Sequence, residues 1–328
     1  NGIIFADRRE AHRSAKAQTM KYYYQPILFQ LSEKEVRIQN RYTFRDTSHL
    51  LFVLEQLVDG VVIRTEEFQL CLKAGAYMSY PICTVSEPGE LVYRISAVQK
   101  EAQDGIRKGT VLACEECVIR TGDSPVFMAQ PEQRPKVIDG HYTIGVHTQD
   151  VTYLFRKAGV SYTVAGLYGI QVAGEEFLVR EVQPTVFRPN TSNDIGNAFV
   201  FQSALALSYA KFVRGVNEKM VYGIVENSFE ITYRYTFDHN NMEGATITYR
   251  VNAAGEMKVT ATVDPLTNLK SLPLFGLHFE IPKNKEQFTY YGKGPFETYP
   301  DRKDGILSGI YHGFCEKEYV NYLYPQEC

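Results

Sequence analysis

Several features that would narrow the function of a protein are missing from this sequence of 328 residues. No apolar run approaches the roughly 20 residues that a membrane-spanning helix needs, which excludes such a helix. Lys and Arg number 35 against 38 Asp and Glu, and no basic stripe is interleaved with aromatic residues. We therefore expect neither nucleic acid nor a membrane as a partner.

Cysteine is sparse, since six cysteines are spread along the chain without the density of a disulfide-stabilised scaffold. We expect free thiols in a reducing compartment, and hence a cytoplasmic protein. Cys114 and Cys117 form a CxxC pair, but residues 111–119 have the composition of a strand. Because no second CxxC or HxxxH pair is present, we predict neither a zinc site nor a redox site there.

Aromatic and β-branched residues are abundant, and turn residues recur throughout, which favours strands over helices. In the first part of the chain, period-two alternation predicts strands near residues 36–44, 50–63, 67–72, 90–98 and 110–119. Asp59 and Gly60 predict a hairpin turn within the second of these runs. Short strands with regular turns over about a hundred residues are typical of an immunoglobulin-like or fibronectin III-like sandwich.

Residues 120–136 gather proline, glycine and charge, which is the composition of a linker. Beyond them we predict strands at residues 229–237, 245–251, 257–263 and 274–281, with a hairpin turn at 252–255. Helix-compatible spacing occurs at residues 12–23, ended by Pro26, and at residues 199–212. The chain is thus predicted to be mainly β.

The most specific pattern lies near the C-terminal end. Residues 290–302 have the sequence YYGKGPFETYPDR, and residues 324–327 have the sequence YPQE. Gly292, Gly294 and Pro295 predict a tight turn at the end of an aromatic strand. Asp301 and Arg302 are individually best interpreted as a charge pair that braces a loop, because such pairs far outnumber catalytic ones.

These blocks resemble the YxGxGPxExYPDR and PQE motifs of lac-type β-galactosidases, in glycoside hydrolase family 2. The matching positions are Gly292, Gly294, Pro295, Glu297, Tyr299, Asp301, Arg302, Gln326 and Glu327. Residues 187–196 resemble a third block of the family, FxRAPTDNDxG, and match it at Arg188, Asn193, Asp194 and Gly196. In the family these blocks lie in the C-terminal domain rather than in the catalytic barrel, so we interpret these residues as structural.

The resemblance implies four parts. Residues 1–24 correspond to the tail of the catalytic barrel and residues 25–120 to an immunoglobulin-like β-sandwich, while residues 121–136 are the linker. Residues 137–328 correspond to a large antiparallel supersandwich related to galactose mutarotase. Since the chain starts at Asn1 rather than Met and stops directly after the PQE block, we expect the natural N-terminus and the last strands of the supersandwich to be missing.

The same resemblance bears on catalysis. Retaining hydrolysis of a β-galactoside needs two carboxyl groups about 5 Å apart. In the family both are barrel glutamates upstream of the match to Asn1, so this chain is expected to hold no catalytic residue and to be inactive alone. We expect it to act as the non-catalytic part of an enzyme that hydrolyses lactose-type β-galactosides, bracing the barrel and shaping the active-site wall.

Metal ions and assembly are likewise implied only for the intact enzyme. Asn1 matches an asparagine that helps to hold a sodium ion beside the galactose pocket, and hard cations prefer such oxygen ligands. Magnesium and sodium are expected in the intact enzyme, with a β-galactoside as substrate and a homo-oligomer as the assembly. For this chain alone we expect no cofactor.

The residues themselves leave two further interpretations open. A carbohydrate-binding β-sandwich module would have to rely on tyrosine, because tryptophan is absent. An aldose epimerase would need a histidine opposite a glutamate. Of the seven histidines, the candidates are His141, His147, His239, His278 and His312, and the first, second and fourth of these are predicted in strands. The acidic candidates Glu175, Glu176, Asp194, Glu297 and Glu327 are more often solvated or bracing charges.

Overall fold

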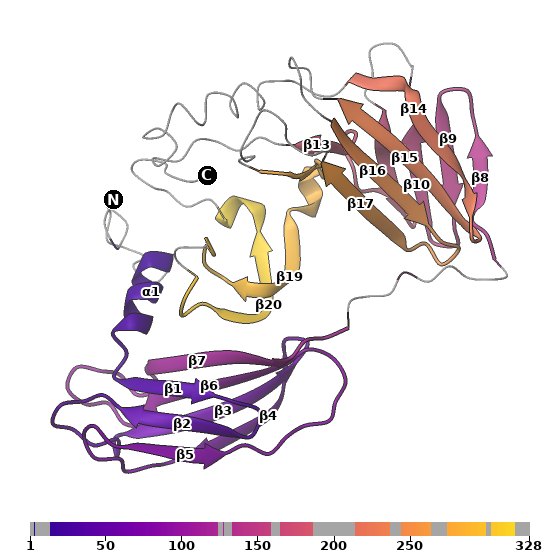
Figure 1. Ribbon diagram of the computed structural model, residues 1–328. Helices are drawn as coiled ribbons and strands as arrows, with labels where there is room; N and C mark the ends of the chain where they lie inside the picture. Colours follow the sequence, from indigo (N-terminus) through magenta and orange to yellow (C-terminus); the bar gives the residue numbers. More distant parts are fainter. Residues whose placement is uncertain are drawn as a thin grey trace. The chain divides into compact units, whose positions relative to one another are not determined.

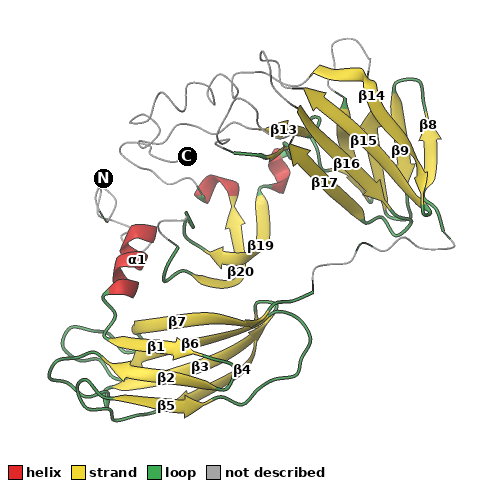
Figure 2. Ribbon diagram, in the orientation of Figure 1, coloured by secondary structure: helices red, strands yellow, loops and turns green. Residues whose placement is uncertain are grey.

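The computed structural model describes residues 3, 14–123, 127, 133–158, 165–185, 214–236, 244–263, 274–299 and 303–318. The chain forms two compact units, one of Asn1–Pro125 with Gln287–Leu323 and one of Val126–Glu286 with Tyr324–Cys328. Strands predominate in both, and every strand pair described is antiparallel (Figure 2). The predicted mainly β fold is confirmed. Within these residues, no helix has the length and apolar character needed to cross a membrane.

The first unit contains a sandwich of two sheets, with strand orders β1-β2-β5 and β4-β3-β6-β7 (Figure 1). Its strands are β1 (Ile27–Leu31), β2 (Glu35–Asn40), β3 (Leu50–Val58), β4 (Val61–Phe68), β5 (Tyr77–Pro81), β6 (Leu91–Gln99) and β7 (Val111–Arg120). Alternate side chains of these strands point inward, so Ile38, Phe52 and Ile95 are completely buried between the two sheets.

The hairpin turn predicted at Asp59 and Gly60 is confirmed, since both residues have positive φ, 49° and 81°, and they join β3 to β4. Two predicted strands are wrong in extent. Of the strand predicted at residues 67–72, only Glu67 and Phe68 lie in a strand, as the end of β4. β2 stops at Asn40, four residues before the predicted end, because the buried Asn40 amide donates to the carbonyl oxygens of Arg45 and Leu72. Its Oδ1 accepts from the Tyr42 amide, and these bonds turn the chain.

A helix and a late hairpin complete the first unit. Helix α1 (Ala15–Tyr23) begins at Ser14, whose Oγ accepts from the Ala17 amide, and it ends before Pro26, as the sequence predicts. The hairpin consists of β19 (Gln287–Gly294) and β20 (Leu307–Phe314), followed by a short 3-10 helix at Cys315–Lys317. It belongs to the first unit although it follows the second unit in sequence.

The second unit also packs two sheets, with strand orders β12-β11-β10-β9-β8 and β14-β15-β16-β17, and a separate pair, β13-β18. Its strands are β8 (Lys136–Asp139), β9 (Thr143–His147), β10 (Val151–Arg156), β11 (Gly166–Val172), β12 (Glu175–Glu176), β13 (Gln183–Thr185), β14 (Arg214–Val225), β15 (Ser228–Thr236), β16 (Gly244–Val251), β17 (Met257–Val263) and β18 (Gly276–His278); a 3-10 helix covers Lys283–Lys285. Phe155 and Leu167 of one sheet share a core with Ile231 and Tyr249 of the other.

The strands predicted at 229–237, 245–251 and 257–263 are confirmed as β15, β16 and β17. The strand predicted at 274–281 is wrong in length, since only Gly276–His278 pair, with β13. The hairpin turn at 252–255 is confirmed, because Gly255 has a φ of 86° and its amide donates to the carbonyl oxygen of Asn252. The helix predicted at 199–212 lies outside the described residues.

Candidate functional site

The glycine motif is placed inside a strand rather than in a turn. Gly292 pairs with Gly309, and Gly294 with Leu307, along the β19–β20 hairpin. A Cβ atom on Gly294 would lie 2.1 Å from the Tyr290 hydroxyl oxygen and 2.9 Å from Cδ2 of Tyr311, so the close approach of two tyrosines requires glycine. The predicted tight turn is therefore wrong. The chain leaves the strand only at Pro295, whose preceding peptide bond is cis.

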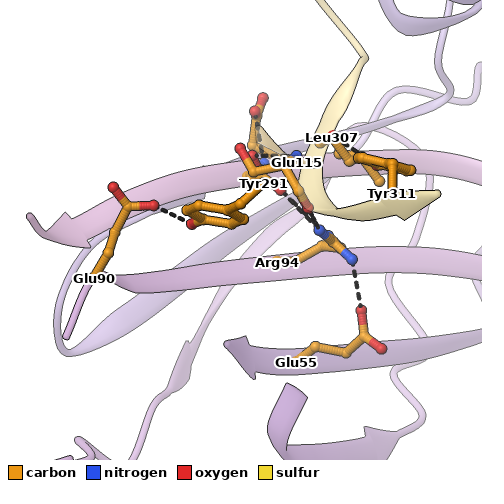
Figure 3. A network of polar contacts seen from close by, with 9 residues as sticks. Glu55, Glu90, Arg94, Glu115, Tyr291, Leu307 and Tyr311 are labelled. Carbon is orange, nitrogen blue, oxygen red and sulfur yellow. Dashed lines mark hydrogen bonds and ion pairs between the residues drawn. The ribbon is translucent and has the colours of Figure 1, made fainter. Parts of the chain in front are cut away.

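The hairpin is joined to the sandwich by Arg94, which points toward it from the middle of β6 (Figure 3). One guanidinium nitrogen lies 3.0 Å from Oε2 of Glu116 on β7, and another lies 3.5 Å from Oε2 of Glu55 on β3. Arg94 also donates to the carbonyl oxygen of Ser308 in β20, and the Ser308 amide donates to Glu116 at 3.0 Å. We call Glu55, Arg94, Glu116 and Ser308 the hairpin brace.

The brace is mostly withdrawn from water. The Arg94 side chain is 15% exposed and that of Glu116 is 8% exposed. Charges at such depth are tolerated only when they are paired and hydrogen-bonded, and here the guanidinium and the Glu116 carboxylate satisfy each other and the backbone of β20. The hairpin is therefore held by directional bonds as well as by packing.

A second contact lies at the turn between β3 and β4. The Tyr291 hydroxyl of β19 donates to Glu90 (Figure 3). The Tyr291 ring covers Gly60 so closely that a Cβ there would lie 2.6 Å from Cε2 of the ring. Burial, with the bond to Glu90, raises the pKa of Tyr291 above its usual value. Glycine at position 60 thus allows both the positive φ of the turn and the close contact with the Tyr291 ring.

Helix α1 is fastened to the same region. The Tyr22 hydroxyl donates to Glu115 of β7 at 2.6 Å, and the Tyr23 hydroxyl donates to Asp304 at 2.5 Å. Burial and the bond to Glu115 raise the pKa of Tyr22. Gly305, with a φ of 77°, lets the loop before β20 pass beside Tyr22, where a Cβ would lie 2.6 Å from that of Tyr22.

These elements enclose a small recess of about 60 Å³, lined among others by Tyr22, Glu115, Glu116, Lys293 and Asp304. Its carboxylates all accept bonds: Glu115 from Tyr22, Glu116 from Arg94 and Ser308, and Asp304 from Tyr23. Among the described residues, no group of three His, Cys, Asp or Glu side chains is arranged to hold a metal ion. The polar residues of the recess therefore join helix α1, the sandwich and the hairpin to one another by hydrogen bonds and an ion pair.

The predicted site residues fall into two groups. Gly292, Gly294, Pro295, Glu297 and Tyr299 lie in β19 and the segment after it. The others lie outside the described residues: Asn1, Arg188, Asn193, Asp194, Gly196, Asp301, Arg302, Gln326 and Glu327. The roles predicted for these residues stay predictions. Sequence reasoning missed Arg94 and Glu116, although a charged residue in the middle of a buried strand such as LVYRISAVQ is itself a signal.

The remaining acidic candidates brace the backbone. Glu175 pairs with Lys285 at 2.6 Å, and Oε1 of Glu176 accepts from the amides of Ile170, Phe177 and Leu178. Asp194 and Glu327 lie outside the described residues.

Two of the three histidines predicted in strands are found there. His147 ends β9 and His278 ends β18. The prediction for His141 is wrong, because Gly140 and Thr143 close a turn around it between β8 and β9. His312 lies in β20 beside Thr289, and His239 is outside the described residues.

Comparison with known proteins decides the family. Residues 148–328, more than half of the chain, match the family described as beta galactosidase small chain. The chain belongs to the β-galactosidase small-chain family. Residues 36–120 match a second family, described as beta-galactosidase, domain 4.

Several β-galactosidases resemble the whole chain. The β-galactosidase of Streptococcus thermophilus is 29% identical over 333 residues, and that of Lactobacillus delbrueckii subsp. bulgaricus is 30% identical over 332; each comparison covers 100% of this chain and 31% of the relative. A β-galactosidase small subunit of Latilactobacillus sakei is 32% identical over 219 residues, which cover 61% of this chain and 67% of that relative. The chain therefore spans about 31% of the length of the first two relatives.

The small-chain match and the compact units do not coincide. The match runs from residue 148 to residue 328 and so includes β19 and β20, yet these strands contact the sandwich that carries the domain 4 match. The small-chain region thus contacts the domain 4 region, which precedes it in sequence, through the hairpin brace.

Proposed function

We propose that this chain is a non-catalytic C-terminal part of a lac-type β-galactosidase of glycoside hydrolase family 2, which hydrolyses terminal β-galactosides such as lactose with retention. The observation that carries the proposal is coverage: β-galactosidases match the chain over its whole length, while the chain spans only 31% of them. In this proposal the catalytic glutamates belong to the remaining two thirds of the parent enzyme.

The proposed role is to brace the catalytic barrel and to shape one wall of the active site. The hairpin brace supports this role, because it ties the small-chain region to the domain 4 sandwich through buried, paired charges. In the second unit, two antiparallel sheets around one core are compatible with the proposed supersandwich.

Sodium and magnesium belong to the proposal only for the parent enzyme. Their ligands are proposed to belong mainly to the rest of the parent enzyme, with Asn1 contributing to the sodium site. The parent is proposed to be a cytoplasmic homo-oligomer.

Titration calorimetry of the purified chain with galactose and lactose tests the scaffold role. A scaffold gives no saturable heat at millimolar sugar, whereas micromolar binding would make the chain a carbohydrate-binding module. Polarimetry of freshly dissolved α-galactose is the second arm. Mutarotation at the uncatalysed rate is expected, and acceleration in proportion to the chain concentration would make it an epimerase.

A further inference from the structure

The connection between β2 and β3, residues 41–48, is bonded to two other connections of the sandwich, and we call it the β2–β3 segment. The Thr47 amide donates to the carbonyl oxygen of Leu72 at 3.2 Å, and the Thr47 hydroxyl oxygen accepts from the Leu72 amide at 2.9 Å. Arg45 lies 3.1 Å from Oδ2 of Asp104 and donates to Oε1 of Gln103 at 3.0 Å. The segment thus links the β4–β5 connection to the β6–β7 connection.

His49 directly follows this segment, and its imidazole has no hydrogen-bond partner. Both ring nitrogens are buried, and within the described part of the chain neither of them makes a hydrogen bond. The ring lies against that of Tyr42, with the two centroids 5.5 Å apart. Buried polar groups are seldom left unpaired, and a neutral imidazole leaves one N–H donor unpaired where a protonated one leaves two. The closed arrangement therefore accommodates the neutral ring better than the charged one.

The charges around His49 also favour the neutral ring on balance. Burial is the largest cause that lowers the pKa of His49 below its ordinary value, and the Arg45 guanidinium lowers it further. Asp46 and Asp104 raise the pKa of His49, but they do not cancel the effect of burial. Since Asp104 pairs with Arg45, part of its charge is already neutralised.

The other polar groups beside His49 are bonded to further residues. Oδ1 of Asp46 accepts from both the amide and the hydroxyl of Ser48. The Lys100 amide donates to the His49 carbonyl oxygen at 3.0 Å, while the Lys100 ammonium donates to Gln69 at 2.9 Å. A proton added to the imidazole therefore gains no hydrogen bond in the closed arrangement and lies near the like charge of Arg45.

We propose that His49 makes the β2–β3 segment a pH-dependent switch, in which protonation of the imidazole releases the segment from the β4–β5 and β6–β7 connections. The charged ring has two N–H donors that water satisfies only after the ring leaves its buried position. The same charge repels the Arg45 guanidinium, which weakens the contacts with Gln103 and Asp104. The bonds between Thr47 and Leu72, which close over the segment, are then exposed to solvent.

The direction of the switch follows from proton binding. In the released form His49 has its ordinary pKa of about 6.5, whereas in the closed form its pKa is lower. Between these two values the released form binds more protons than the closed form. The equilibrium constant for release therefore rises by up to about tenfold for each unit by which the pH falls below ~6.5. Above that pH the closed form keeps its full stability.

Amide hydrogen exchange of the 328-residue chain tests the switch, with rates expressed as protection factors to remove their intrinsic pH dependence. Between pH ~7.5 and ~5.5, protection of the Thr47 and Leu72 amides is expected to fall roughly threefold to tenfold. Protection of Ile247, in the middle of β16, should stay unchanged. Unchanged protection at Thr47 would overturn the proposal, and so would an equal fall at Ile247, which would assign the change to the whole chain.

Two variants assign the response to one histidine. His49→Phe keeps an aromatic ring beside Tyr42 but binds no proton, so protection at Thr47 should be equal at the two pH values. His141→Gln changes an exposed histidine of the second unit and, as the matched control, should keep the wild-type response. A fall in His49→Phe as large as in the wild type would overturn the proposal.

Titration of the wild-type imidazole by nuclear magnetic resonance needs no variant. A midpoint for His49 below ~6.5 is expected, and a midpoint at or above this value would overturn the proposal. None of these outcomes depends on the proposed galactosidase function, since they measure only local opening and proton binding.

Discussion

Arg94 and Glu116 lie opposite each other on β6 and β7, with a guanidinium nitrogen 3.0 Å from the Glu116 carboxylate. Both side chains also bind the backbone of Ser308. Arg94 donates to the Ser308 carbonyl oxygen, and Glu116 accepts from the Ser308 amide. Two charged side chains of the sandwich are therefore completed by the backbone of a strand that lies about two hundred residues later in the sequence. The stability of the hairpin and that of the sandwich should consequently be coupled.

Arg94→Met is expected to lower the free energy of unfolding by about 2–4 kcal/mol, because it leaves the buried Glu116 carboxylate without its cation. Urea unfolding at neutral pH measures the loss. Lys108→Met is the matched control: its ion pair with Glu101 is 69% and 71% exposed, and the change should stay below about 0.5 kcal/mol. Adding Glu116→Gln to Arg94→Met should recover part of the loss. Equal effects at residues 94 and 108 would show that the brace contributes nothing specific.

Gly294→Ala should destabilise the hairpin by about 1–3 kcal/mol, since the new methyl group overlaps the Tyr290 hydroxyl and the Tyr311 ring. Gly292→Ala, in the same strand, is the control, because its Cβ would lie 3.8 Å from Tyr290, an ordinary contact. Tyr290→Phe removes the hydroxyl and should partly rescue Gly294→Ala. Amide hydrogen exchange of β19 and β20 reports the change locally. Similar losses at residues 292 and 294 would contradict close packing as the reason for this glycine.

Stability should fall at alkaline pH through the buried or hydrogen-bonded tyrosines. The hydrogen bond to Glu66, with burial, raises the pKa of Tyr80 to about 12. Because the folded pKa lies above the unfolded value of about 10, the contribution of Tyr80 is complete below pH ~10 and is lost as the pH rises toward ~12. Tyr80→Phe should flatten the fall in unfolding free energy over this window. If Tyr80→Phe leaves the pH dependence of the unfolding free energy unchanged, Tyr80 does not contribute to it. Tyr77→Phe, a change at an exposed residue of the same strand, is the control.

Tyr22→Phe should loosen helix α1 from the sandwich, because it removes the bond to Glu115 and leaves that carboxylate without its phenol donor. We expect the α1 amides to exchange with solvent roughly fivefold faster, corresponding to about 1 kcal/mol. Tyr23→Phe removes an exposed bond to Asp304 and should have a smaller effect. Faster exchange in Tyr23→Phe than in Tyr22→Phe would contradict the importance of burial at this contact.

The sequence predicted correctly those features that depend only on neighbouring residues, namely hairpin turns and the limits of regularly alternating strands. The positive-φ requirement of Asp59 and Gly60 predicts their hairpin, and strict alternation in β15, β16 and β17 predicts their limits to within one residue. Short strands such as β18 are harder, because three paired residues carry too little periodicity.

The candidate site depended on contacts that alternation does not encode. Gly292 and Gly294 carry a glycine signal that fits a turn as well as a close approach, and only the rings of Tyr290 and Tyr311 decide between them. Arg94 and Ser308 meet across a large separation in sequence, so no local pattern could pair them. The family motif located the hairpin, whereas its partners on β6 and β7 required the structure.

One assay shows whether this chain is a scaffold whose parent enzyme supplies the catalytic glutamates. The purified 328-residue chain is incubated with a chromogenic β-galactoside, and release of the aglycone is followed to the detection limit. A scaffold without catalytic glutamates gives no turnover above the buffer rate. Turnover that follows the chain through successive purification steps and scales with its concentration would contradict it.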